Sequence, residues 1–233
     1  MTPDEAKLLA ARAAVSLLPE HGTIGLGTGS TAKLFIDEVG ALVKAGRKLV
    51  GVPTSKASRA QGEALGIPML DDDGPWSIDV CVDGADEVSE GLDLIKGGGG
   101  ALTREKIVNF AAKISVIIVD ESKLSRRLGE TWPVPVEVVR FGHAATAHAL
   151  SRFGVPKLRT KDGQPFVTDA GGFIYDVKVP PIDDPAALEK AMDSVPGVTE
   201  TGLFVLRASV VLVAGTNGVR ELRLTPLPFA GGA

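Results

Sequence analysis

Residues 23–32 read Thr-Ile-Gly-Leu-Gly-Thr-Gly-Ser-Thr-Ala, and this stretch decides the fold class. Thr23–Leu26 predicts a short apolar strand, Gly27–Thr31 a glycine-rich turn, and Ala32–Lys44 a helix. Such a turn presents backbone N–H groups and a helix N-terminus to an anion, typically a phosphate. Further hydroxyl donors come from Thr28, Ser30 and Thr31. The stretch therefore predicts an anion-binding turn in an α/β sheet.

Two other interpretations of the turn stay open. The spacing Gly27-x-Gly29-x-x-Ala32 also matches a loose dinucleotide-binding fingerprint. That fingerprint needs an acidic residue about 20 positions later, at the end of the next strand. The sequence there is Pro53-Thr54-Ser55-Lys56, without a carboxylate. A small phosphorylated ligand is thus favoured over a dinucleotide, and a tight turn that only lets strand and helix pack is the structural alternative.

On both sides of this stretch the sequence alternates apolar strands with helices. Thr2, Pro3 and Glu5 predict a capping box at the start of a helix that extends to about Leu18. Further strands are predicted at Lys48–Val52, Ile78–Val82 and Ile114–Val119, and further helices at Lys56–Leu65 and Thr103–Lys113. This alternation is typical of a parallel sheet covered by helices.

The pattern changes near Pro133, where the predicted elements take the ferredoxin-like order β-α-β-β-α-β. They are strand Val134–Val139, helix Ala144–Phe153, a strand interrupted by the turn Lys161–Gly163, strand Phe173–Val179, helix Pro185–Ser194 and strand Val198–Leu206. Ser209–Ala214 resembles the first region again. We therefore expect a discontinuous Rossmann-like catalytic domain of residues 1–130 and 207–225, a smaller ferredoxin-like α+β domain of residues 131–206, and a tail of residues 226–233.

Composition argues against several classes of protein. The 233 residues include 25 Lys and Arg against 29 Asp and Glu, so the formal net charge is −4. This balance argues against nucleic-acid or membrane partners. The single cysteine, Cys81, excludes an internal disulfide framework, and His143 and His148 are not at the four-residue spacing of helical zinc ligands. No secretory signal is visible after Met1, so we expect a cytoplasmic protein.

A second candidate site is the acidic stretch Asp83-Gly84-Ala85-Asp86-Glu87. It follows a buried strand, and in open α/β sheets the carboxyl ends of the strands face the ligand. Three carboxylates this close repel one another unless a cation, bound hydroxyls or protonation offsets the repulsion. A solvated acidic turn is the alternative. The residues before it, Val80–Val82, are apolar, which indicates a buried strand below a ligand site and disfavours a solvated turn.

A third candidate site begins at Lys96, which is followed by the four glycines Gly97–Gly100. Glycine loses much conformational entropy on folding, so this run indicates that the backbone approaches another group closely. Lys96 supplies a positive charge, and Glu105 falls in the first or second turn of the next helix. Taken alone, Glu105 is as well explained by the helix dipole. Lys123 follows a strand end, which favours ligand contact.

In their order and spacing, these motifs resemble ribose-5-phosphate isomerase of type A. The matching stretches are Gly27–Thr31, Asp83–Glu87, Lys96–Gly99, Ala101–Lys106, Pro133–Glu137 and Pro196–Val198. The resemblance extends from the N-terminal helix to about Leu224. Two departures are slight: Gly100 stands where many relatives have Ala, and the tail Pro226–Ala233 is extra.

The resemblance implies an enzyme that interconverts ribose 5-phosphate and ribulose 5-phosphate in the pentose phosphate pathway, without metal or cofactor. It also implies a Rossmann-like domain, a smaller α+β domain, and a homodimer or homotetramer. By motif, Glu105 corresponds to the family's catalytic base. The family's substrate-contacting stretches correspond to Thr28, Gly29, Ser30, Thr31, Asp83, Gly84, Ala85, Asp86, Lys96, Gly97, Gly98, Gly99 and Lys123.

These residues suit an aldose–ketose exchange through an enediolate. One carboxylate, Glu105, can remove the proton at C2 and return it at C1, because the two carbons are adjacent. Lys96 and the amides of the glycine loop can stabilise the developing oxyanion. Asp83 or Asp86 can bind hydroxyls and help to open the sugar ring.

Three other functions stay open on the residues alone. Lys96 could form a Schiff base in a sugar-phosphate aldolase. A non-catalytic sugar-phosphate sensor would bind the same ligands, although the acidic chain shows no DNA-binding helix with a basic face. A dinucleotide oxidoreductase would need the ribose-binding acid that residues 53–56 lack.

Overall fold

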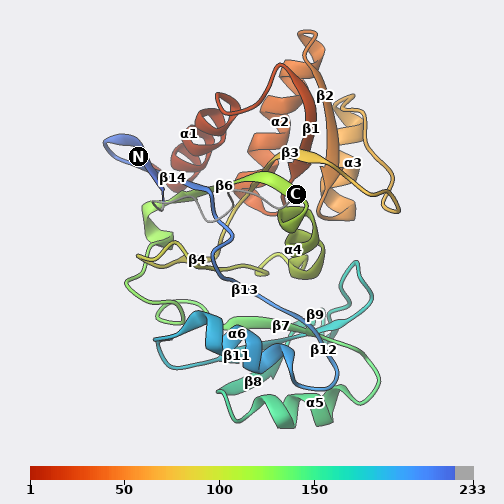
Figure 1. Cartoon of the computed structure of the whole chain (residues 1–233), viewed down its shortest axis with the longest axis vertical. Coiled ribbons are helices and arrows are strands. Elements are labelled where there is room, and N and C mark those ends of the chain that lie inside the picture. The colour runs from red at the N-terminus through yellow and green to blue at the C-terminus, as the bar shows by residue number, and fades with distance from the viewer. Residues whose placement is uncertain (224–233) are drawn as a thin grey trace. The chain divides into compact units, whose positions relative to one another are not determined.

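A computed structural model of the chain describes residues 1–223, which divide into two compact units. The first unit comprises Met1–Gly84, Glu105–Lys123 and the residues from Arg207 onward. The second comprises Ala85–Arg104 and Leu124–Leu206. The tail expected at residues 226–233 lies outside the described residues. Figure 1 shows the helices and strands of the chain.

The first unit contains a six-stranded sheet with the order β15-β14-β6-β3-β1-β2. Its strands are β1 (His21–Leu26), β2 (Lys48–Pro53), β3 (Ile78–Asp83), β6 (Ala112–Asp120), β14 (Val210–Gly215) and β15 (Gly218–Leu222). All neighbours pair in parallel except β14 and β15, which form an antiparallel hairpin. This mostly parallel sheet confirms the predicted Rossmann-like α/β fold.

Helices cover the sheet of the first unit. They are α1 (Pro3–Val15), α2 (Ser30–Lys44), α3 (Lys56–Ala64), α4 (Leu102–Phe110) and the 3-10 turn η1 (Glu121–Lys123). The predicted capping box is confirmed at α1, where the Glu5 N–H donates to Thr2 Oγ1 and the Thr2 N–H to Glu5 Oε2. Figure 1 shows α1 and α2 side by side.

Apolar side chains fill both faces of this sheet, as parallel strands require. On one face, buried residues of α1 and α2 such as Ala10 and Phe35 pack with Ile24 and Val82 of the strands. On the other face, Val108 of α4 joins a cluster with Cys81 of β3. Cys81 is thus a small core residue, as expected.

The second unit is an α+β structure with a four-stranded antiparallel sheet. Its elements are β4 (Glu87–Val88), β5 (Leu94–Ile95), β7 (Val134–Val138), α5 (His143–Leu150), β8 (Val155–Leu158), β9 (Thr160–Lys161), β10 (Gln164–Pro165), β11 (Phe173–Lys178), α6 (Pro185–Asp193), β12 (Val198–Thr201) and β13 (Leu203–Phe204). The sheet order β12-β7-β11-β8 and the connections through α5 and α6 confirm the predicted ferredoxin-like arrangement.

A small sheet, β13-β5-β4, is the main feature that the sequence did not predict. The expected single strand Val198–Leu206 divides at Gly202, whose N–H donates to the Pro135 carbonyl and whose carbonyl accepts from Lys96 N–H. The chain therefore leaves β7 and pairs with β5. By this pairing, residues 85–104 belong to the second compact unit, although the sequence assigned them to the first domain. Residues 124–130 are also in the second unit. Compact units are not the same as domains, so the expected domain boundaries stay a prediction.

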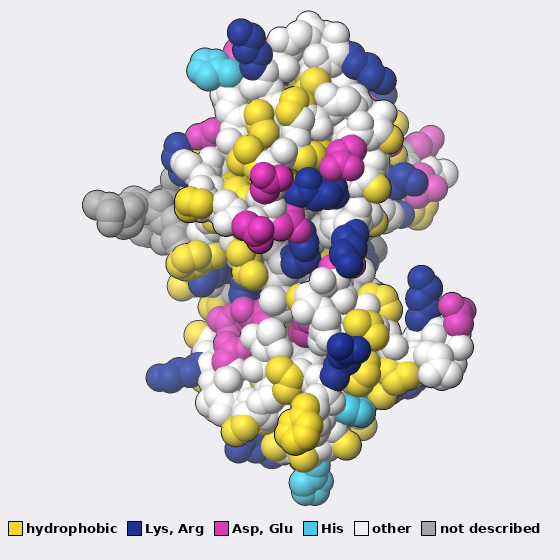
Figure 2. All heavy atoms as spheres, turned by 90° about the vertical axis from the view of Figure 1, so that its right-hand side faces the viewer, with side chains coloured by type: hydrophobic (Ala, Val, Ile, Leu, Met, Phe, Trp, Pro, Cys, Tyr) yellow, Lys and Arg dark blue, Asp and Glu magenta, His cyan; other side chains and the backbone are white. Residues whose placement is uncertain are grey.

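The surface of the described residues fits the composition. Lys, Arg, Asp and Glu side chains are interspersed over the face shown in Figure 2. No helix within residues 1–223 is long and apolar enough to cross a membrane.

The division of the strand at Gly202 gives the first testable prediction. A Cβ at this position would lie 2.2 Å from the Lys96 carbonyl oxygen and 2.7 Å from Pro135 Cδ. Gly202→Ala should therefore lower the free energy of unfolding by about 1–3 kcal/mol, the usual cost of overpacking. Urea denaturation measures the change, with Gly91→Ala as the control, because the nearest atoms there lie 3.7 Å away. Equal stability of the two variants would contradict this account.

Candidate active site

The carboxyl edge of the first sheet brings the glycine turn and Asp83 together. β1 and β3 are neighbours, with Leu26 opposite Val82, so the turn after β1 meets the last residue of β3. The Thr28 N–H donates to Asp83 Oδ1 over 2.9 Å, and the Gly84 N–H donates to the same oxygen over 2.8 Å. The Asp83 carboxylate thus fixes the turn through backbone donors.

Two glycines make this turn possible. A Cβ at Gly27 would lie 2.1 Å from Asp83 Oδ1 and 2.7 Å from Asp83 Cα. Gly29 has a φ of 121°, which side chains rarely adopt, and it is the N-cap of α2. α2 therefore begins with Ser30 and Thr31 directly after this turn, and anion binding at its N-terminus stays a prediction.

Buried hydroxyl groups behind the turn set its shape. Thr28 Oγ1 lies 2.7 Å from Thr54 Oγ1, and Ser58 Oγ donates to the Gly27 carbonyl over 2.6 Å. Thr54 and Ser58 are buried, at the end of β2 and in α3. In the sequence, residues 53–56 stand out only by the lack of a carboxylate, and nothing there indicates that Thr54 and Ser58 support the turn.

A cavity opens beside the turn. It measures about 340 Å³ and is lined by Thr28, Gly29, Lys33, Ile36, Ala57, Ser58 and Gln61. Lys33, in the first turns of α2, brings a positive charge to its wall. Lys33 is not among the residues predicted from the sequence, although a basic residue just after a glycine-rich turn is a recognisable signal.

Glu105 lies in the first turn of α4 and is buried, with 3% of its surface exposed. α4 ends at Phe110, and β6 begins at Ala112 opposite Ile78, the first residue of β3. The helix therefore runs away from the carboxyl edge of the sheet. Val108 packs against Cys81, and Glu105 is one turn earlier on the same helix face. Glu105 thus lies toward the edge that carries Asp83.

Lys123 lies at the same edge of the first sheet. It is the last residue of η1, directly after β6, which pairs with β3. Ser122 N–H donates to Asp120 Oδ1 over 2.9 Å and so fixes the turn that carries Lys123. The first unit therefore gathers, along one edge, the candidates Thr28, Gly29, Ser30, Thr31, Asp83, Gly84, Glu105 and Lys123.

The remaining candidates, Ala85, Asp86 and Lys96–Gly99, belong to the second unit. There the Gly98 N–H donates to Asp86 Oδ2 over 2.6 Å. Lys96 is buried, and its Nζ lies 5.4 Å from the centre of the Phe204 ring. Asp86 and the glycine loop are thus brought together in the same way as Asp83 and the first turn.

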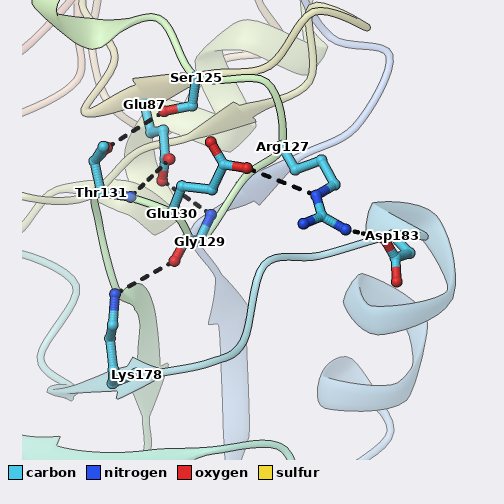
Figure 3. A network of polar contacts seen from close by, with 8 residues as sticks. All are labelled: Glu87, Ser125, Arg127, Gly129, Glu130, Thr131, Lys178 and Asp183. Atoms are coloured by element: carbon cyan, nitrogen blue, oxygen red, sulfur yellow. Dashed lines mark hydrogen bonds and ion pairs between the residues drawn. The ribbon is translucent and has the colours of Figure 1, made fainter.

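Glu87 has a structural place that the sequence did not reveal. This buried carboxylate accepts backbone N–H bonds from Gly129 and Thr131 over 3.0 Å (Figure 3). It also accepts one from Trp132 over 3.1 Å. Burial alone would raise its pKa, but the hydrogen bonds from Ser125, Thr131 and Gly129 together outweigh burial, so the pKa of Glu87 lies below its ordinary value. Backbone N–H groups are therefore partners of all three carboxylates in the acidic stretch.

Glu137 is a second buried carboxylate near candidate residues. Its oxygens accept hydrogen bonds from the hydroxyl groups of Thr103, over 2.6 Å, and Thr168. Thr103 stands at the start of α4, two residues before Glu105. Glu137 therefore fixes the beginning of the helix that carries Glu105.

No three His, Cys, Asp or Glu side chains within residues 1–223 converge as metal ligands would.

Comparisons with known proteins agree on one family. The family model of ribose 5-phosphate isomerase A (phosphoriboisomerase A) matches residues 50–218. A ribose-5-phosphate isomerase A from Gloeobacter violaceus is 47% identical over 230 residues, which cover 98% of this chain and 100% of the relative. The solved ribose 5-phosphate isomerase A of Methanocaldococcus jannaschii is 41% identical, with a TM-score of 0.91 over 96% of this chain and 100% of that one.

A second solved structure carries a ligand. It is a D-ribose-5-phosphate isomerase in complex with phospho-erythronic acid, 40% identical to this chain with a TM-score of 0.92. The match covers 96% of this chain and 100% of that one.

The Glu87 contacts predict how stability depends on pH. A carboxyl whose pKa is lowered by folding adds stability above its ordinary pKa of about 4.3. That stability is lost as the pH falls through the lower folded value. Glu87→Gln should therefore lower the free energy of unfolding at pH 7 and flatten its decline below about pH 4.

Denaturation with urea between pH 3 and pH 7 measures this dependence. Glu130→Gln is the control, because Glu130 lies in the same segment and contacts Arg127 rather than the backbone donors. If the free energy of unfolding of Glu87→Gln declined below pH 4 as steeply as that of the wild type, the stabilising role of the Glu87 carboxylate would be contradicted.

Proposed function

The chain belongs to the ribose 5-phosphate isomerase A family and is an isomerase, and from this premise we propose that it interconverts D-ribose 5-phosphate and D-ribulose 5-phosphate through an enediolate. The observation that carries the proposal is the buried Glu105 at the sheet edge that also holds an anion-binding turn. The phospho-erythronic acid bound by a relative supports a phosphorylated sugar as the ligand.

The turn Gly27–Thr31 binds the phosphate group in this proposal. The N-terminus of α2 provides backbone N–H groups and the positive end of the helix dipole. The hydroxyl groups of Ser30 and Thr31 complete the donors, and Lys123 at the same edge adds positive charge. Asp83 Oδ1 already accepts from the N–H groups of Thr28 and Gly84, so in this proposal the Thr28 N–H serves that carboxylate and not the phosphate.

Glu105 acts as the base that moves the proton between C2 and C1. An aldose loses the proton at C2 and the ketose gains one at C1, so a single carboxylate between the two carbons serves both steps. Positioned proton transfer of this kind contributes about 10²–10⁴-fold to rate. Burial of Glu105 and the anchoring of its helix by Glu137 support this role, because both hold the carboxylate in one place.

Lys96 and the amides of Gly97 and Gly99 stabilise the negative charge that develops on O1 and O2, while the Gly98 N–H holds Asp86. A fixed donor at such an oxygen is typically worth about 10²–10³-fold. Asp83 and Asp86, with Gly84 and Ala85 between them, bind the sugar hydroxyls and assist ring opening. The pentose phosphate pathway, a cytoplasmic location and a homodimer or homotetramer are parts of the proposal that rest on the resemblance alone.

The base assignment predicts the behaviour of Glu105→Gln. The variant should lose at least about 10²-fold in kcat, because an amide cannot take up the proton. Proton NMR of ribose 5-phosphate in deuterated water, with EDTA-treated protein, follows ribulose 5-phosphate and solvent deuterium in the product. Glu20→Gln, an exposed carboxylate change in the first unit, is the control.

Two outcomes would contradict this account. Wild-type activity in Glu105→Gln would remove Glu105 as the base. A covalent adduct trapped at Lys96 by borohydride in the presence of substrate would instead favour an aldolase that uses a Schiff base.

The phosphate assignment predicts a different pattern for Ser30→Ala. Loss of a hydroxyl donor to a charged group typically costs about 1.5–3 kcal/mol. KM should therefore rise about tenfold or more, while kcat changes little, because the phosphate is bound equally in the ground and transition states. Steady-state kinetics measure both constants, and Ser16→Ala is the control, because Ser16 caps the end of α1. An unchanged KM would contradict phosphate binding at this turn.

A further inference from the structure

The glycine loop Lys96–Gly99 is held on its carbonyl side by a residue outside every motif of the sequence. Arg159 lies between β8 and β9. Its Nη1 donates to the Gly97 carbonyl over 2.7 Å and to the Gly98 carbonyl over 3.2 Å. One guanidinium group therefore binds two successive peptide oxygens of the loop.

Arg159 is itself held by the sheet of the second unit. Its Nε donates to Asp176 Oδ2 over 3.0 Å, and its Nη2 forms an ion pair with Asp176 Oδ1. The two side chains are only 17% and 23% exposed, so the pair is partly shielded from solvent. The Arg159 backbone is also fixed, because its N–H donates to the Ile174 carbonyl over 2.8 Å. A two-point ion pair of this geometry leaves the guanidinium little freedom.

The contacts orient the N–H groups of the loop. In a trans peptide the C=O and N–H bonds point in opposite directions. The peptide between Gly97 and Gly98 is held at both ends, by Arg159 on its oxygen and by Asp86 on its N–H. The next peptide also turns its oxygen to Arg159, so the Gly99 N–H points away from the guanidinium. The positive charge further polarises both peptides and strengthens their N–H groups as donors.

A run of glycines needs such support, because the glycine backbone can adopt more conformations than that of any other residue and therefore loses more entropy when it is fixed. We propose that Arg159, held by Asp176, is a positioning residue that fixes the Lys96–Gly99 loop for catalysis. The inference rests on the proposed function, in which the amides of this loop stabilise the oxyanion. Arg159 acts through the loop: its donors are bound to the loop carbonyls and to Asp176.

Arg159→Met tests the proposal, since methionine keeps an unbranched stem and removes the donors. Small misplacement of catalytic groups costs about 10²-fold, so kcat should fall by about that factor. KM should change less than about threefold, because the phosphate is bound at the turn of the first unit. Arg159→Lys should recover little of the loss, because one ammonium cannot bridge two carbonyls and a carboxylate.

Arg127→Met is the matched control. Arg127 also pairs with an aspartate of the second unit, Asp183, over 2.6 Å, but it does not contact the glycine loop. Its kcat should stay within about threefold of the wild type, and its melting temperature should fall less than that of Arg159→Met, because its ion pair is more exposed. A purely structural role for Arg159 would give both variants the same kcat per folded molecule.

Two further tests keep the proposal testable if Arg159→Met does not fold: a second variant, Asp176→Asn, and amide hydrogen exchange, which does not depend on activity. Asp176→Asn keeps the shape of the side chain and should lower kcat in the same direction, and its combination with Arg159→Met should add little further loss. Amide hydrogen exchange should be faster at Gly98, whose N–H is bound to Asp86, in Arg159→Met, and unchanged there in Arg127→Met.

The outcomes separate this inference from the proposed function. Wild-type turnover of ribose 5-phosphate together with equal kcat values for Arg159→Met and Arg127→Met would overturn the inference alone. Unchanged exchange at Gly98 in Arg159→Met would also overturn it. No turnover by the wild type would overturn the proposed function and this inference with it.

Discussion

The Asp83 carboxylate accepts backbone N–H bonds from Thr28 and Gly84, and the candidate site of the first unit depends on this contact. Parallel pairing of Leu26 with Val82 brings the turn after β1 against the end of β3. Any side chain at Gly27 would overlap with Asp83. The turn can therefore approach Asp83 only because residue 27 is glycine, and the path of the turn sets the positions of the first residues of α2. The shape of the candidate anion site at this edge is therefore a consequence of one strand pairing.

Carboxylates bound to fixed donors recur in the second unit. Asp86 holds Gly98, Glu87 holds the backbone of residues 129–132, and Glu137 holds Thr103. A buried carboxylate is stable only where such bonds replace its water. Asp86 and Glu137 fix segments that carry or adjoin candidate residues, whereas Glu87 fixes a segment without one. These three carboxylates therefore hold backbone or side-chain donors of the second unit, while Glu105 is proposed as the base.

Sequence patterns predicted the larger elements because their signals are local. The capping box at Thr2 and the β-branched run within β6 each identify an element from a few neighbouring residues. The two-residue strands β4, β5 and β13 were missed, because they are too short to show a period and Leu203 pairs with Ile95 far along the chain. Arg159 gave no signal, since it lies beside a turn and its contact spans 62 residues to Gly97.

The amino-acid sequence alone was enough to predict the longer strands and helices, the positions of the glycine-rich turns and the resemblance to one isomerase family. These depend on local polarity and on the backbone freedom of glycine, both of which a short stretch of residues contains. Only the tertiary structure decided which donors meet Asp83, Glu87 and Glu137, and that Arg159 reaches the glycine loop. These partners are distant in the chain and meet only after the strands have paired, because a hydrogen bond requires contact in space and not proximity in sequence.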